Sequence, residues 1–138
     1  MEMAAHNSAV KALAFSNSDS NLLMTGGGIN DKTIKVWDLI NFSPKKSLNS
    51  SNQICGINWE NDHQIVIGSG KSVEIWRKKG WKKIGEAEEH EGRILGIKEC
   101  IQENFICSLG SDETMRFWRW RERKEKKPKS NHNFLLQN

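Results

Sequence analysis

Three tryptophans recur along the chain at nearly equal intervals, and each of them follows an apolar residue. The pairs are Val36-Trp37, Ile75-Trp76 and Phe117-Trp118. Their spacing of about 40 residues is typical of repeat proteins that stack one small structural unit on the next. Such a unit cannot bury its hydrophobic face alone, so it must pack against a neighbour. The tryptophan spacing therefore predicts three stacked units instead of one continuous core.

Short alternating apolar segments in each unit predict β-strands. Gly26-Gly27-Gly28 supplies the backbone freedom that a sharp connection between two of them needs, and Ser43-Pro44 breaks the pattern before a short outer strand. The third unit offers no outer fourth strand. The expected strands are 10–15, 22–25, 33–37 and 46–49 in the first unit, 54–59, 64–67, 72–76 and 81–85 in the second, and 93–97, 105–109 and 114–118 in the third.

A tryptophan at this period within four-stranded units predicts an all-β fold, a partial WD-repeat β-propeller. We place its three blades at about 6–49, 50–86 and 87–120, and a basic polar tail at 121–138. Closed propellers hold roughly four to eight blades, and three alone leave open faces and strand edges. We therefore expect that missing blades or another chain close the ring.

The composition of the chain excludes several classes of protein. Its 138 residues are 36% hydrophobic and 28% charged, which is ordinary for a soluble domain. The apolar runs are far too short to span a membrane, and no signal peptide is evident. Cys55, Cys100 and Cys107 show no metal-ligand spacing, so we expect no metal site or cofactor and buried, reduced thiols.

The positive charge is concentrated near the end of the chain. Eight basic and two acidic residues lie between Arg116 and Lys129, while the whole chain has a net charge of +4. Arginines beside Trp118 and Trp120 could bind nucleic acid through charge and stacking. The glutamates that interrupt this segment favour a solvated extension or a nuclear-targeting sequence over a nucleic-acid partner.

Two sets of four polar and aromatic residues stand at matching positions in the first and third units. A histidine, a hydroxyl and an aspartate also form catalytic triads. Inside a β-blade, however, such a set joins strands by buried hydrogen bonds, and we expect this structural role and no catalytic residue. The second unit has Gln53 and Gly70 in place of the histidine and aspartate, so we expect no such set there. The two sets are His6, Thr25, Asp31 and Trp37, and His90, Ser108, Asp112 and Trp118.

The segments around these sets carry more information than the repeat spacing alone. They are residues 6–15 with 21–28 and Asn30-Asp31, then 52–55, 90–95 and 110–118, in that order. Together they resemble the Fizzy and Fizzy-related activators of the anaphase-promoting complex, over roughly residues 6 to 120. The resemblance implies a non-enzymatic subunit that presents degron peptides to this ubiquitin ligase and activates it during the cell cycle. It also implies a nuclear and cytoplasmic protein of seven blades.

The resemblance implies three degron-binding residues. Gln53 and Arg93 match positions that contact the KEN degron, and Glu113 matches the acidic residue that holds the arginine of the destruction box. The implied partners are subunits of the anaphase-promoting complex and degron-bearing cell-cycle proteins.

Some positions depart from the family pattern. Ile29 stands where the family has a threonine on the KEN surface, and the chain ends in Leu135-Leu136-Gln137-Asn138 instead of Ile-Arg. The family's first blades and C-box region are not found, so we expect an incomplete copy that is a poor activator alone. A general WD-repeat interaction scaffold and a tail-mediated nucleic-acid binder remain the alternative functions.

Overall fold

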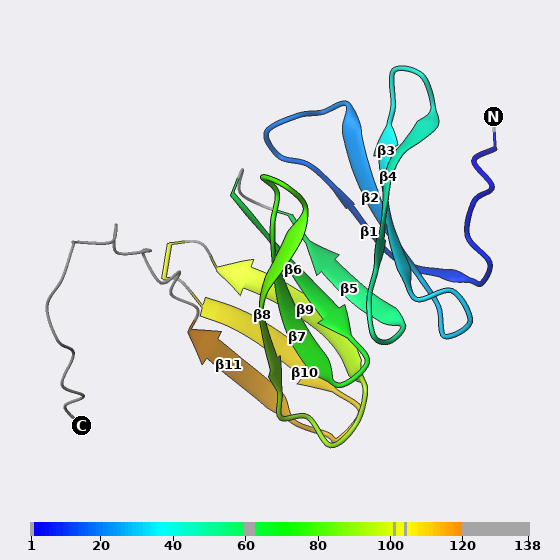
Figure 1. The fold of residues 1–138 in the computed structure, drawn as a ribbon. Helices are drawn as coiled ribbons and strands as arrows, with labels where there is room; N and C mark the ends of the chain where they lie inside the picture. The colour runs from blue at the N-terminus through cyan, green and yellow to red at the C-terminus, as the bar shows by residue number, and fades with distance from the viewer. Residues whose placement is uncertain (1, 60–62, 101, 104, 120–138) are drawn as a thin grey trace, which may run out of the picture.

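The computed structural model describes residues 2–59, 63–100, 102–103 and 105–119. Its strands form three antiparallel sheets that stand side by side as blades (Figure 1). Blade 1 contains β1 (Val10–Phe15), β2 (Leu22–Gly27), β3 (Thr33–Asp38) and β4 (Ser43–Asn49). Blade 2 contains β5 (Ile54–Asn58), β6 (Gln64–Ser69), β7 (Ser72–Arg77) and β8 (Lys82–Glu88). Blade 3 contains β9 (Ile94–Cys100), β10 (Phe105–Gly110) and β11 (Met115–Arg119).

Each blade is a simple meander in which every strand pairs with the next one along the chain. The first strands of the blades come together, since β1 lies against β5 and β5 lies against β9 (Figure 1). The predicted all-β fold is therefore confirmed as a partial propeller with two four-stranded sheets and one three-stranded sheet in the described residues. Because these residues contain no helix, they also contain none that is long and apolar enough to cross a membrane.

Two hydrophobic cores fill the spaces between consecutive blades. The core between blades 1 and 2 is centred on Met24, Ile34 and Val36 of the first blade and on Ile54 and Ile65 of the second. The core between blades 2 and 3 joins a second set, Val66, Val73, Ile75, Ile94 and Ile106. Blade 2 therefore has one apolar face packed against blade 1 and another packed against blade 3, as the repeat spacing predicts.

The outer strands are longer than the sequence pattern predicts. β4 begins at Ser43 and not at residue 46, and β8 extends to Glu88 and not to residue 85. Pro44 is tolerated because it lies opposite Trp37, where the register shifts, on an outermost strand whose free edge needs no N–H donor from it. The pairing of β7 with β8 also shifts register between Ile75 and Trp76 of β7.

The expectation of buried cysteines is wrong for Cys100 and only half correct for the other two. Cys55 and Cys107 are half-buried, Cys100 is exposed at the end of β9, and all three are free thiols. Cys107 is half-exposed because it lies on β10 in the last sheet, where the described residues provide no following blade. The basic tail, 121–138, lies outside the described residues.

Candidate functional site

In blade 1 the four expected residues form one chain of hydrogen bonds. Trp37 Nε1 donates to Thr25 Oγ1 at 2.7 Å, and Thr25 Oγ1 lies 2.7 Å from His6 Nε2. His6 Nδ1 contacts the carboxylate of Asp31, which also accepts a hydrogen bond from Thr33 at 2.8 Å. The two ring nitrogens of His6 thus link the Thr25 hydroxyl to the Asp31 carboxylate.

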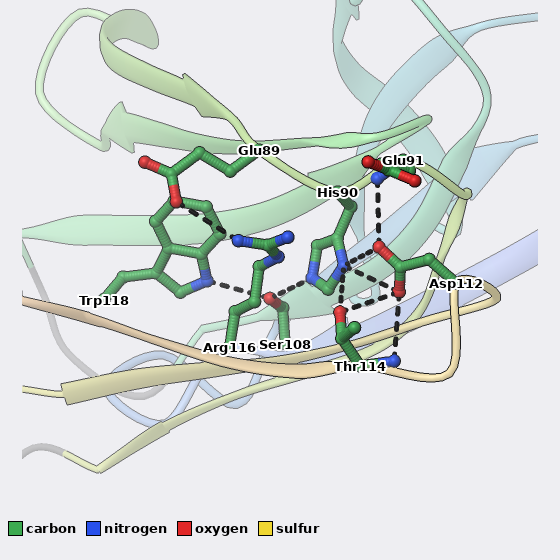
Figure 2. Close-up of polar contacts among 8 residues, drawn as sticks. All are labelled: Glu89, His90, Glu91, Ser108, Asp112, Thr114, Arg116 and Trp118. Atoms are coloured by element: carbon green, nitrogen blue, oxygen red, sulfur yellow. Dashed lines mark hydrogen bonds and ion pairs between the residues drawn. The ribbon is translucent and has the colours of Figure 1, made fainter.

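Blade 3 repeats this arrangement with a serine as the central hydroxyl (Figure 2). Trp118 Nε1 donates to Ser108 Oγ at 2.8 Å, and Ser108 Oγ lies 2.7 Å from His90 Nε2. His90 Nδ1 lies 2.9 Å from Asp112 Oδ2, which also accepts the backbone N–H of Glu91. The histidine of each set lies in the segment just before the first strand of its blade. The hydrogen bonds therefore tie this segment, the entry of the blade, to the second and third strands.

Blade 2 lacks the set with histidine and aspartate, as the sequence predicts, but a different hydrogen-bond network takes its place. Ser50 lies four residues before β5, at the place that His6 and His90 occupy in their blades. Its hydroxyl lies 2.6 Å from Ser69 Oγ and donates to Glu74 Oε1 at 2.9 Å. Glu74 Oε2 accepts the N–H of Trp76 at 2.8 Å, and Glu74 is fully buried. A serine pair and a glutamate thus replace the histidine and aspartate.

Ser69 can take part in this network because blade 2 has no aspartate side chain to fill the space beside it. A Cβ atom on Gly27 would overlap the Asp31 carboxylate, and a Cβ atom on Gly110 would overlap Asp112 and His90. Blade 2 has Gly70 in place of the aspartate, which leaves room for the side chain of Ser69 at the position of these glycines. The sequence contained this signal, since a serine replaces glycine only in the blade that lacks the aspartate.

The aspartates of both sets are held in the charged form. Burial alone would raise the pKa of Asp31, but hydrogen bonds from His6 and Thr33 outweigh it and lower the pKa. Burial acts in the same direction on Asp112, and hydrogen bonds from His90, Thr114 and Glu91 lower its pKa well below the usual range. These carboxylates therefore act as fixed hydrogen-bond acceptors.

Neither set has the access that a hydrolase needs. Ser108 is fully buried, and its oxygen already accepts the indole N–H of Trp118. Thr25 is only 8% exposed and is bonded in the same way to Trp37. A catalytic nucleophile must reach its substrate, so this geometry supports strand cross-linking and not acyl transfer. The described residues also contain no cluster of three metal-ligating side chains.

Gln53 and Arg93 come from different blades and line the same pocket, which has a volume of about 280 Å³. Gln53 directly precedes β5 and Arg93 directly precedes β9. The two first strands lie against each other, so the residues at their starts meet near the inner edge of the blades. The other lining residues are Lys11, Cys55, Ile94 and Leu95.

Sequence reasoning missed Lys11 and Cys55 as members of this pocket. Lys11, Cys55 and Leu95 are each the second residue of the first strand of their blade. Aligning the three repeats on these strands would have brought them together. Burial raises the pKa of the Cys55 thiol, so the thiol is neutral near pH 7. The pocket therefore carries the positive charges of Lys11 and Arg93 and the amide of Gln53.

Glu113 lies apart from the residues that line this pocket. It is exposed in the turn between β10 and β11, and its backbone φ of 63° is in the left-handed region. Its neighbours Asp112 and Thr114 are held by the hydrogen bond from Thr114 to Asp112 at 2.8 Å. The turn thus presents the Glu113 carboxylate outward from a fixed backbone.

The fold and its hydrogen-bonded sets define this chain as a partial WD-repeat β-propeller. The family model of the WD domain, G-beta repeat, matches residues 1–38. A solved structure, the crystal structure of the mitotic checkpoint complex, contains a chain that is similar with a TM-score of 0.78 and 28% sequence identity. This similarity covers 85% of the present chain and 38% of that chain.

Three curated relatives are cofactors, subunits or activators of the anaphase-promoting complex. The chain is 33% identical, over 82% of its length, to cell division cycle 20.1, cofactor of APC complex, from Arabidopsis thaliana. It is also 33% identical to anaphase-promoting complex subunit cdc20 of Dictyostelium discoideum, over 91%, and to APC/C activator protein CDH1 of Saccharomyces cerevisiae, over 83%. These matches cover 26%, 26% and 21% of the relatives. The resemblance to the Fizzy and Fizzy-related activators is thereby confirmed, and the chain spans about a quarter of their length.

Proposed function

We propose that these blades form part of a substrate-recognition and activator subunit of the anaphase-promoting complex. In this role the chain is not an enzyme and binds degron peptides of cell-cycle proteins in the nucleus and cytoplasm. The observation that carries the proposal is that Gln53 and Arg93, from two blades, line one pocket. The similarity to activators of the complex supports the same assignment.

The chemistry of the pocket fits the KEN motif, whose side chains are an ammonium, a carboxylate and an amide. The Arg93 guanidinium can hold a carboxylate by two charge-assisted hydrogen bonds, and Lys11 adds a second positive charge. The amide of Gln53 offers a donor and an acceptor, which matches the side chain of asparagine. The glutamate of the motif is therefore assigned to Arg93 and its asparagine to Gln53.

Glu113 is assigned to a separate contact with the destruction box. Its exposed carboxylate can pair with the arginine of that degron, and the rigid turn holds it in place. The other side of this contact comes from an element beyond the described residues. The KEN and destruction-box contacts are thus expected to respond to different mutations.

Peptide binding to the full chain tests the KEN assignment. A fluorescent KEN peptide should bind more tightly than a peptide with alanine at all three positions, as measured by anisotropy. Because charge-assisted hydrogen bonds contribute about 1.5–3 kcal/mol, Arg93→Ala should weaken KEN binding at least about tenfold, and Gln53→Ala should weaken it several-fold. Lys45→Ala, on the exposed outer strand β4, is the control and should leave affinity unchanged. Equal affinity for both peptides would instead favour a general interaction scaffold.

A further inference from the structure

The two interfaces between blades use the same close contact. In blade 1, a Cβ atom on Gly26 of β2 would overlap the side chain of Ile54, the first residue of β5. In blade 2, a Cβ atom on Gly68 of β6 would lie 2.9 Å from Cγ2 of Ile94, the first residue of β9. Each glycine therefore makes room for the isoleucine that opens the following blade.

Leu109 occupies the same position in blade 3. The strand pairing shows the equivalence, because each of the three residues lies between matching positions on its first and third strands. Gly26 pairs with Ala12 and Ile34, Gly68 pairs with Gly56 and Val73, and Leu109 pairs with Gly96 and Met115. Blade 3 thus has a four-carbon side chain where blades 1 and 2 cannot accommodate even one carbon.

This leucine belongs to an apolar surface that no other described element covers. We call it the third-blade face and define it by Leu109, Met115 and Phe117, which are 48%, 57% and 64% exposed. The residues equivalent to Met115 and Phe117 are Ile34 and Val36 in blade 1, both of which are fully buried. The third-blade face therefore continues the surface through which blades 1 and 2 hold their following blades.

We propose that the third-blade face accepts a further β-blade whose first strand opens with glycine or alanine instead of isoleucine. The space that Ile54 and Ile94 fill at the other interfaces is taken by Leu109 itself, so the incoming residue must be small. Blade 1 of a second copy does not meet this requirement, since its first strand opens with Val10. Leu109 thus selects the blade that docks and prevents head-to-tail assembly of identical chains.

The self-association of the full chain, measured by sedimentation equilibrium, tests this proposal with a second copy as the probe. Val10→Gly supplies the small residue that Leu109 requires, and Leu109→Gly restores the contact seen at the other interfaces. Since relief of one overpacked contact changes affinity by roughly 10-fold or more, each variant should associate at least about tenfold more tightly than the wild-type chain. The double variant, Val10→Gly with Leu109→Gly, leaves a void at the contact between the two chains and should associate more weakly than either single variant.

The controls identify the surface that is used. Ile40→Gly changes another exposed apolar residue, in the turn between β3 and β4, and should not alter association. Adding Phe117→Glu to the Leu109→Gly chain should abolish association, because it places a charge on the third-blade face. If circular dichroism shows that Val10→Gly weakens folding, the association of the Leu109→Gly variant alone tests the proposal. Wild-type association equal to that of Leu109→Gly, or association that survives Phe117→Glu, would overturn the proposal.

Discussion

Trp76 donates its indole N–H to the carboxylate of Glu74 at 2.8 Å, inside a blade that lacks the usual histidine and aspartate. The same carboxylate accepts the Ser50 hydroxyl at 2.9 Å, and Lys83 Nζ lies 3.6 Å from it. One buried glutamate thus joins the entry of blade 2 to its third strand. Blade 2 therefore keeps the cross-strand link of its neighbours with different chemistry.

Glu74→Ala should destabilise the chain strongly. It removes the acceptor of Trp76 and of Ser50, and each buried polar group without a partner costs about 1–3 kcal/mol. We expect a loss of about 2–4 kcal/mol in the free energy of unfolding, measured by urea denaturation. Glu88→Ala, an exposed position on β8, should change it by less than about 0.5 kcal/mol. Equal losses in the two variants would show that Glu74 does not hold the blade together.

The hydroxyl of Ser108 should be essential to blade 3. Ser108→Ala removes the atom that accepts from Trp118 and bonds His90, so the free energy of unfolding should fall by about 1–3 kcal/mol. Ser111→Ala is the matched control, because Ser111 is exposed in the turn between β10 and β11. A midpoint of urea unfolding that is the same for both variants would contradict the buried hydrogen-bond chain.

Acid should weaken the blades through Asp31 and Asp112. Both have pKa values that folding lowers, so their contribution to stability is present above the unfolded value of about 3.9 and is lost as pH falls below it. The free energy of unfolding should therefore decline from about pH 4 downward. The Asp31→Asn, Asp112→Asn double variant should be less stable at pH 7 and should show a shallower decline. A decline as steep as that of the wild-type chain would show that other carboxylates carry it.

Ile29→Thr should improve binding of the KEN peptide. Ile29 is 53% exposed in the turn after β2, at a position where the family resemblance implies a threonine whose hydroxyl contacts the peptide. One added hydrogen bond contributes about 0.5–1.5 kcal/mol, so affinity should rise roughly 2- to 10-fold. Ile40→Thr makes the same change at another exposed turn and should have no effect. No gain from Ile29→Thr would remove this turn from the proposed degron surface.

The repeat pattern was sufficient to predict the blades because strand alternation and the tryptophan spacing are local signals. It failed at β4, where Pro44 lies inside a strand, because only the pairing geometry reveals an edge position and a register shift. The Glu74 network was missed for a different reason. Alignment to the usual histidine and aspartate positions pointed to Gln53 and Gly70, whereas the groups that bond are Ser50, Ser69 and Glu74.

For the candidate pocket, too, local motifs identify single residues, but only the packing of the blades shows which residues lie together. Resemblance supplied Gln53 and Arg93, but their proximity depends on how the first strands of separate blades pack. Lys11 and Cys55 follow from the same packing and from no local motif. Leu109 is visible as a large residue in a glycine position only after the three second strands are compared.

The most direct test of the proposed degron site is an exchange of charge between Arg93 and the peptide. The wild-type chain should bind a KEN peptide at least about tenfold more tightly than a peptide with lysine in place of its glutamate, because the proposed site pairs Arg93 with that carboxylate. Arg93→Glu should reverse this preference in the same anisotropy measurement. An unchanged preference for KEN in the Arg93→Glu chain, or no preference in the wild-type chain, would contradict the assignment.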